Sequence, residues 1–156
     1  MTAFDLRAAQ FPQELPLVRS LFEEYAESLG IDLCFQNFAD ELRCLPGKYQ
    51  VPQGALLLAW EDGQALGCVA MRPVDHNRCE MKRLYVRPEA RGRQLGLLLA
   101  QQICALAHNA GYRQICLDTL PSMLAARQLY DKLGFRPVAP YVFNPIDGVI
   151  FLGLDL

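Results

Sequence analysis

The sequence predicts a single domain of mixed α/β class over residues 1–156. Three apolar segments between residues 55 and 87 are separated by tight-turn signals, a pattern that predicts an antiparallel meander. The last of these segments is followed by an apolar helix and another strand, which predicts a right-handed crossover between two parallel strands. A hydrophobic content of 52% in 156 residues is enough for a proper core.

The first half of the chain is predicted from turn signals and helical spacing. Apolar side chains recur at helical spacing up to a natural stop at Gly30, and Asp62-Gly63 marks a hairpin turn. The elements expected before residue 90 are strands at 3–7, 55–60, 65–72 and 79–87, a helix at 12–28, and a short helix capped by Asn37 that ends before Pro46.

The second half contains the most strongly periodic segment. Leu95, Leu99, Ile103 and Leu106 form one apolar stripe, and Gly111 is a natural stop. The elements expected here are helices at 94–110 and from Pro121 to Gly134, and strands at 114–119, 135–138 and 149–154.

Composition argues against several classes of function. The net charge of −2 gives no reason to expect nucleic-acid binding. No apolar run reaches the ~18 residues of a membrane span and the N-terminus lacks a signal-peptide pattern, so we expect a cytoplasmic protein without membrane contact. The six cysteines include no CxxC pair and are accompanied by two histidines, so we expect reduced thiols and no metal site.

The junction between the central strand and the long helix predicts an anion site. Arg87, Arg91 and Arg93 lie in the turn, and Gly92 allows close backbone approach. Unpaired N–H groups and the positive end of the helix dipole favour a phosphate or pyrophosphate at residues 91–97. Residues 1–77 carry a net charge of −6 and residues 78–156 a net charge of +4, which suits an anionic ligand near this turn. A solvated basic face would produce the same pattern.

Two motifs together carry a resemblance to a known family. The stretch EMKRLYVRPEARGRQLG, which begins at Glu80, and LYDKLGF, which begins at Leu129, resemble the GNAT family of N-acetyltransferases. The resemblance implies a central mixed, mostly antiparallel sheet with helices on both faces. It also implies that the strand–helix–strand unit binds acetyl-coenzyme A as cosubstrate.

Matching the family motifs residue by residue gives a set of cofactor-binding positions. The main chain of the central strand is expected to pair with the pantetheine arm, at Leu84, Tyr85, Val86 and Arg87. The phosphate-binding motif falls on Arg91, Gly92, Arg93, Gln94, Leu95 and Gly96, with the backbone amides of 93 to Leu97 holding the pyrophosphate.

Two positions depart from the family pattern. Gln94 stands where the motif has its first Gly, and we expect it to lie in the first helical turn, where a side chain is harmless. Met123 stands where the family often has Asn. Because Met cannot donate that hydrogen bond, Ser122 or a water is expected to replace it.

The chemistry of acetyl transfer needs an acid for the departing thiolate and removal of a proton from the amine. The resemblance implies that Tyr130 is the acid, and a phenol pKa near ~10 is close to that of a thiol; the alternative is a core aromatic. For the base, Glu80 and Asp118 compete. The alternative role for Glu80 is a salt bridge with Lys82 or Arg83. The alternative role for Asp118 is a hydrogen bond in a turn or at a helix cap. Ordered water could also deprotonate the amine.

The resemblance therefore implies direct transfer from acetyl-coenzyme A to a primary amine of an unidentified acceptor, expected to be a small molecule. The alternatives are acetylation of a protein Lys or N-terminus, and a non-catalytic module that senses acyl-coenzyme A. The acceptor pocket is expected from residues 22–49 and 139–149. Dimers are common in that family, so a homodimer is one assembly to expect.

Overall fold

The computed structural model describes residues 3–156, in which seven strands form one sheet in the order β1-β2-β3-β4-β5-β7-β6. The strands are β1 (Asp5–Ala8), β2 (Ala55–Glu61), β3 (Gln64–Pro73), β4 (Arg78–Val86), β5 (Gln114–Thr119), β6 (Arg136–Pro137) and β7 (Ile150–Asp155). Neighbouring strands are antiparallel except β4 and β5, which are parallel. The predicted meander and the predicted helical connection between two parallel strands are both confirmed.

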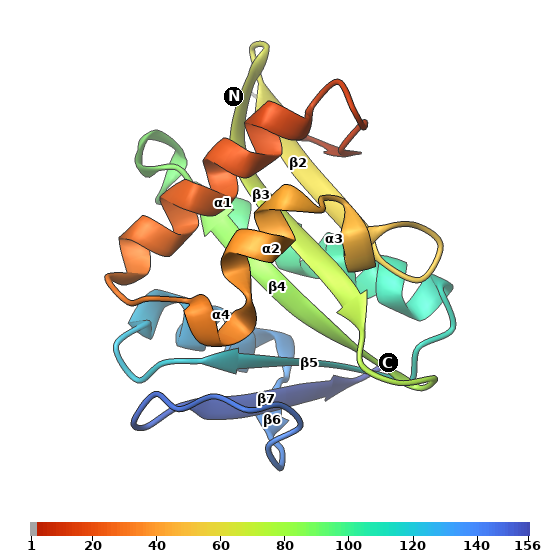
Figure 1. Ribbon diagram of the computed structural model, residues 1–156, viewed down its shortest axis with the longest axis vertical. Coiled ribbons are helices and arrows are strands. Elements are labelled where there is room, and N and C mark those ends of the chain that lie inside the picture. The colour runs from red at the N-terminus through yellow and green to blue at the C-terminus, as the bar shows by residue number, and fades with distance from the viewer. Residues whose placement is uncertain (1–2) are drawn as a thin grey trace.

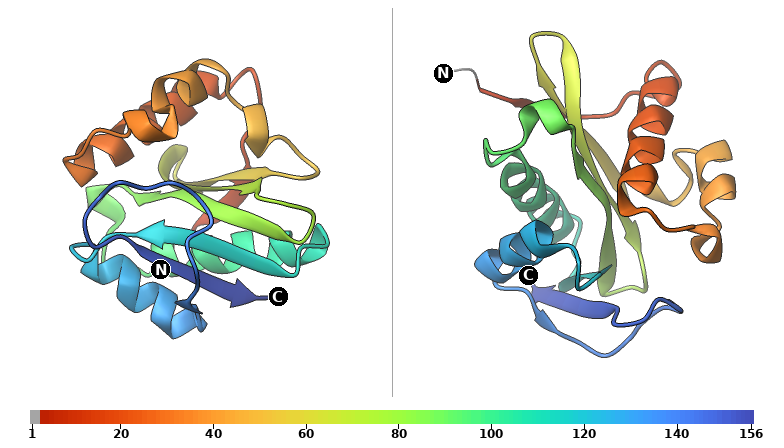
Figure 2. Two further views of the ribbon diagram at one scale, coloured as in Figure 1. Left: turned by 60° about the horizontal axis from the view of Figure 1, so that its bottom comes forward. Right: turned by 90° about the vertical axis from the view of Figure 1, so that its left-hand side faces the viewer.

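Helices cover both faces of this sheet, as Figures 1 and 2 show. On one face lie α1 (Leu15–Leu29) and α2 (Phe38–Arg43); on the other lie α3 (Leu95–Asn109) and α4 (Leu124–Leu133). Short 3-10 turns complete the chain: η1 (Cys34–Gln36), η2 (Gly47–Tyr49) and η3 (Pro88–Ala90). The mixed α/β architecture predicted for the chain is therefore confirmed.

The alternation of side chains along β2 shows how one sheet has two cores. Successive strand residues point to opposite faces. Leu57 packs into the cluster on the α3 side, while Leu56 and Leu58 pack into the cluster beneath α1. The α1 residues Leu21 and Phe22 are fully buried there, and each such side chain contributes roughly 1.5–3 kcal/mol relative to an exposed one.

Several predicted boundaries were too generous. The helix predicted at 12–28 begins at Leu15, with a proline in its first turn. The helix predicted from Pro121 begins at Leu124, because a turn closed by the Met123 N–H to Leu120 O bond, 3.0 Å, precedes it. The strand predicted at 135–138 shortens to Arg136–Pro137, in keeping with a proline that cannot donate to a ladder.

Candidate active site

The two parallel strands, β4 and β5, are paired over a short length and then separate. Within the described residues their register includes three pairs, from Arg78–Gln114 to Glu80–Cys116, although both strands continue further. A crevice therefore opens between them. It is lined by Tyr25, Met81, Lys82, Arg83, Leu84, Leu117, Asp118, Met123 and Tyr130.

A bulge in β4 brings two consecutive basic side chains to the same side of the sheet. Lys82 pairs with Ala70 and Tyr85 with Cys68, so the intervening β4 residues include one more than β3 provides. The extra residue Arg83 takes a left-handed backbone with φ 61. Lys82 Nζ and Arg83 Nη1 consequently both reach one amide oxygen, Gln36 Oε1, at 3.2 and 2.9 Å.

A large groove of about 780 Å³ begins where β4 ends and runs between α3 and α4. The predicted cofactor residues that line it are Leu84, Tyr85, Val86, Arg91, Gly92, Gln94, Leu95, Gly96, Leu97 and Ser122. The α3 N-terminus faces this groove. Its first intrahelical bond runs from Leu98 N to Gln94 O, so the preceding amides are available to an anion.

The expectation that Gln94 lies in the first helical turn is wrong. Gln94 is the residue before α3, with φ 62 and ψ 20, and its side chain makes no cap hydrogen bond. This left-handed conformation is the one that Gly adopts without steric cost. The glycine of the family motif would adopt this left-handed backbone conformation without strain, whereas Gln carries a conformational penalty there.

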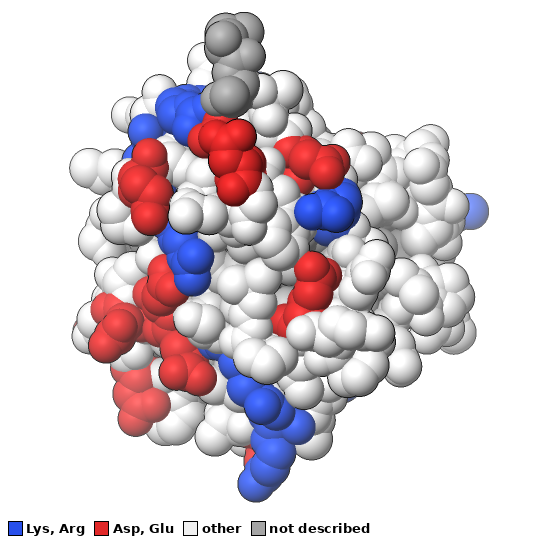
Figure 3. Space-filling model, turned by 90° about the horizontal axis from the view of Figure 1, so that it is seen from above, with Lys and Arg blue, Asp and Glu red and all other residues white. Residues whose placement is uncertain are grey.

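The arginines of the turn do not all face the groove. Arg91 lines it, and its Nε donates to Val86 O at 3.1 Å. Arg87 Nη2 instead donates to Glu24 at 2.8 Å, and Arg93 Nη1 donates to Glu61 at 2.8 Å. Basic and acidic groups lie side by side on the face shown in Figure 3. Much of the basic excess is thus paired with acids from the first half of the chain.

Tyr130 lies on α4 with its side chain buried at the crevice. Its ring packs against Phe135 at a centroid distance of 5.5 Å. Burial raises the pKa of Tyr130, and the negative charge of Asp118 raises it further. Tyr130 is therefore a neutral phenol at neutral pH and can donate a hydrogen bond into the crevice. Its raised pKa makes it a weaker acid than the unperturbed phenol expected from the sequence.

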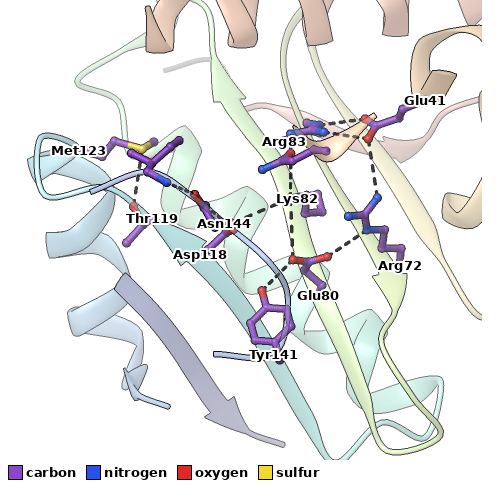
Figure 4. A network of polar contacts seen from close by, with 12 residues as sticks. Glu41, Arg72, Glu80, Lys82, Arg83, Asp118, Thr119, Met123, Tyr141 and Asn144 are labelled. Carbon is purple, nitrogen blue, oxygen red and sulfur yellow. Dashed lines mark hydrogen bonds and ion pairs between the residues drawn. The ribbon is translucent and has the colours of Figure 1, made fainter. Parts of the chain in front are cut away.

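Glu80 is embedded in a polar network, shown in Figure 4. Arg72 Nε donates to its Oε1 at 3.0 Å, and the Tyr141 hydroxyl donates to its Oε2 at 2.8 Å. Its side chain is 2% exposed, and Lys82 Nζ lies 3.8 Å from Oε2. Both oxygens are therefore engaged within the protein, which leaves little room for an incoming ammonium.

Asp118 lies at the carboxyl end of β5 and is more open than Glu80. It lines the crevice and also a second, small pocket of about 20 Å³, which has room for about one water. Asn144 Nδ2 donates to its Oδ2 at 3.0 Å, and Lys82 Nζ lies 3.9 Å from its Oδ1 (Figure 4). Of the two predicted carboxylates, Asp118 is better placed to meet an acceptor.

Three residues of this centre lie in the segments 22–49 and 139–149 expected to form the acceptor pocket, although the sequence assigned no individual role to them. Tyr25 lines the groove, the crevice and the small pocket, and so forms a wall common to all three. Gln36 and Asn144 come from turns far from β4 and β5 in the chain. Their local sequence patterns predict no contact with Lys82 or Asp118, because only the fold brings these residues together.

Two further features of residues 3–156 bear on other functions. Within them no cluster of three or more potential ligand side chains could hold a metal ion. In the same part of the chain, no helix has the length and apolar character needed to cross a bilayer.

Comparison with known proteins agrees with this geometry. The model of the acetyltransferase (GNAT) family matches residues 15–135. An uncharacterised N-acetyltransferase of Schizosaccharomyces pombe is 44% identical over 153 residues, which cover 97% of this chain and 94% of the relative. An acetyltransferase structure from Streptococcus agalactiae superimposes with a TM-score of 0.80 at 18% identity, covering 98% of both chains.

A GNAT acetyltransferase from Elizabethkingia anophelis, solved with acetyl-CoA bound, has a TM-score of 0.63 at 20% identity and covers 98% of both chains. The structural likenesses support the fold, and the family model and the yeast relative support the class of enzyme. The chain therefore belongs to the acetyltransferase (GNAT) family and is an acyltransferase.

Proposed function

We propose that this enzyme transfers the acetyl group of acetyl-coenzyme A directly to a primary amine of a small acceptor. One observation carries the proposal: the groove, the crevice and the small pocket meet at Tyr25 and Met123. A thioester brought along the groove would arrive beside Tyr130, and an amine in the small pocket would arrive beside Asp118. The two reactants would then be held in contact, which is the main requirement of direct transfer.

The proposed cofactor pose follows from the groove. The pyrophosphate would lie against the α3 N-terminus and Arg91, and the pantetheine arm would run along Leu84 to Val86. These β4 residues lie beyond the three pairs that join β4 to β5, so the arm would extend the sheet as an added strand. The acetyltransferase from Elizabethkingia anophelis holds acetyl-CoA on a similar fold, which supports the same ligand here.

Tyr130 would donate to the departing thiolate, and Asp118 would orient the acceptor ammonium. The pocket at Asp118 has room for about one water, so it would admit the ammonium group of the acceptor and leave the rest of the acceptor outside it. Ser122 lines the groove next to Met123, which supports its expected replacement of the family's Asn.

Calorimetric titration with acetyl-coenzyme A tests the cofactor assignment. Wild-type protein should bind in the micromolar range, and the double variant Arg91→Glu, Gly96→Asp should lose binding. Arg113→Glu is a matched charge control, because Arg113 is exposed and follows the opposite end of α3. Failure of the wild-type protein to bind would refute the assignment.

Tyr130→Phe separates an enzyme from an acyl-coenzyme A sensor. In an enzyme, turnover of an amine identified from a library should fall by about 10²–10⁴-fold while cofactor affinity changes little. Unchanged turnover would remove Tyr130 from the mechanism. Binding without turnover of any amine by the wild-type protein would favour the sensor.

A further inference from the structure

The two carboxylates predicted to compete as base lie on either side of one buried amine. Lys82 Nζ is 3.8 Å from Glu80 Oε2 and 3.9 Å from Asp118 Oδ1, and its side chain is 4% exposed (Figure 4). Lys82 also lines the crevice that contains Asp118 and Tyr130. A single nitrogen thus lies near both acids, in a crevice that shares Tyr25, Asp118 and Met123 with the small pocket where the proposed function puts the reacting amine.

This buried amine has one hydrogen bond to a side chain, and its ion pairs with the two carboxylates are long. It donates a hydrogen bond to the neutral amide oxygen of Gln36 at 3.2 Å, and both carboxylates are beyond hydrogen-bond distance. Burial lowers the pKa of Lys82, and the positive charges of Arg83 and Arg72 lower it further, against the opposing effect of Glu80 and Asp118. The neutral form, which has a free lone pair, is therefore more accessible than in an exposed lysine.

The groups around Lys82 come from every neighbouring element. They are Glu80 and Arg83 on β4, Arg72 on β3, Asp118 on β5, Gln36 on η1, Tyr25 on α1 and Tyr130 on α4. Burial raises the pKa of both tyrosines, so they remain neutral. The charges facing the amine are thus two carboxylates and two guanidinium groups.

Proton transfer is most efficient between groups of similar pKa. An acceptor ammonium has a pKa near ~10 and a carboxylate near ~4, so a carboxylate is a poor match for its proton. A neutral lysine is a much closer match. We propose that Lys82 accepts the proton of the bound acceptor ammonium, directly or through one water, while Asp118 orients that ammonium.

The proposal rests on the proposed function, and its protons balance. The ammonium gives one proton to Lys82, and the amine lone pair then forms the new C–N bond. When the C–S bond breaks, the second nitrogen proton passes to the coenzyme A sulfur by way of the Tyr130 hydroxyl. Lys82 returns its proton to solvent, so each turnover yields amide, thiol and one proton.

Nuclear magnetic resonance of the lysine side chains tests the proposal without turnover. The chain has three lysines, and Lys48 and Lys132 are exposed references for Lys82. The measurement uses protein labelled with ¹³C,¹⁵N-lysine, and an unperturbed lysine side chain titrates near ~10.4. The Lys82 signal should titrate at distinctly lower pH. Titration of all three together would overturn the proposal.

Lys82→Arg tests the role in turnover, because Arg keeps the positive charge between the two acids but has no accessible neutral form. We expect kcat/KM to fall about 100-fold or more at pH 7 with unchanged acetyl-coenzyme A affinity. The deficit should shrink as pH approaches the pKa of the acceptor. Lys48→Arg makes the same change on an exposed side chain that lines neither the groove, the crevice nor the small pocket, and it should retain activity.

A Lys82→Arg variant within threefold of wild-type kcat/KM, with the same pH profile, would overturn the role of Lys82 and leave the proposed function intact. Absence of any turnover by the wild-type protein would overturn the proposed function itself and this role with it. If Lys82→Arg fails to fold, the lysine titration of the wild-type protein still decides.

Discussion

Replacing Gln94 with Gly should make the protein more stable, although Gly usually weakens a helix. Gln94 is exposed and has φ 62, a left-handed conformation that costs a residue with a Cβ atom roughly 1–2 kcal/mol. The greater freedom of Gly in the unfolded chain offsets roughly 0.5–1 kcal/mol of that gain. The net increase in the free energy of unfolding is about 0–1.5 kcal/mol, or up to about 6 °C in Tm for a chain of this size.

The matched control is Gln101→Gly, the same chemical change at an exposed position inside the same helix. There the backbone is helical, so Gly should lower the free energy of unfolding by about 1 kcal/mol. Urea unfolding followed by circular dichroism and by the fluorescence of Trp60 measures both variants. The reasoning fails if Gln94→Gly is destabilised as much as Gln101→Gly.

Three other positions should respond to substitution in ways that their contacts determine. Met123 precedes α4 without a side-chain cap, so Met123→Asn should add roughly 0.5–1 kcal/mol in urea melts, and Met123→Ala should not. Burial opposes ionisation of Glu41, but hydrogen bonds and charge from Arg83 outweigh it and lower its pKa. The resulting stability is present above the unfolded pKa near ~4.3 and is lost as pH falls through the folded pKa, so Glu41→Gln should flatten the stability curve measured below about pH 5. Gly67→Ala would place its Cβ 2.8 Å from Tyr85 O, so it should cost roughly 1–3 kcal/mol in thermal melts, and an unchanged Tm would contradict that crowding.

Local patterns determined most of the elements. The strand Gln114–Thr119 was predicted to the residue, and the helix predicted at 94–110 spans Leu95–Asn109. The strand contains an apolar run, and the helix has an apolar stripe and ends shortly before Gly111. The prediction for Gln94 was wrong because Gln is compatible both with the first turn of a helix and with the turn that precedes it. Only the packing of the loop decides between them.

The site was predictable where it follows a continuous motif. The groove residues from Leu84 to Leu97 are close in the chain, so a motif identifies them. The environment of Glu80 was not predictable, since Arg72 and Tyr141 approach it from β3 and from a late loop. The bulge at Arg83 was also hidden, because a bulge is defined by a register between two strands and not by either strand alone.

The ion pairs between the two halves of the chain have a consequence for how the molecule could be assembled. Glu24, Glu41 and Glu61 precede residue 78, and each pairs with an arginine after it. Strands β1–β3 also precede that residue, and β4–β7 follow it, so within the sheet the two halves meet along the β3–β4 edge. They also meet where α3 packs on β2 and β3 and where α1 packs on β4. A backbone cut in the turn at 75–77 would yield fragments of net charge close to −6 and +4, the values for residues 1–77 and 78–156. Copies of the same fragment repel one another, and the two different fragments attract each other. The fold is therefore suited to complementation from two separate chains, most strongly at low ionic strength.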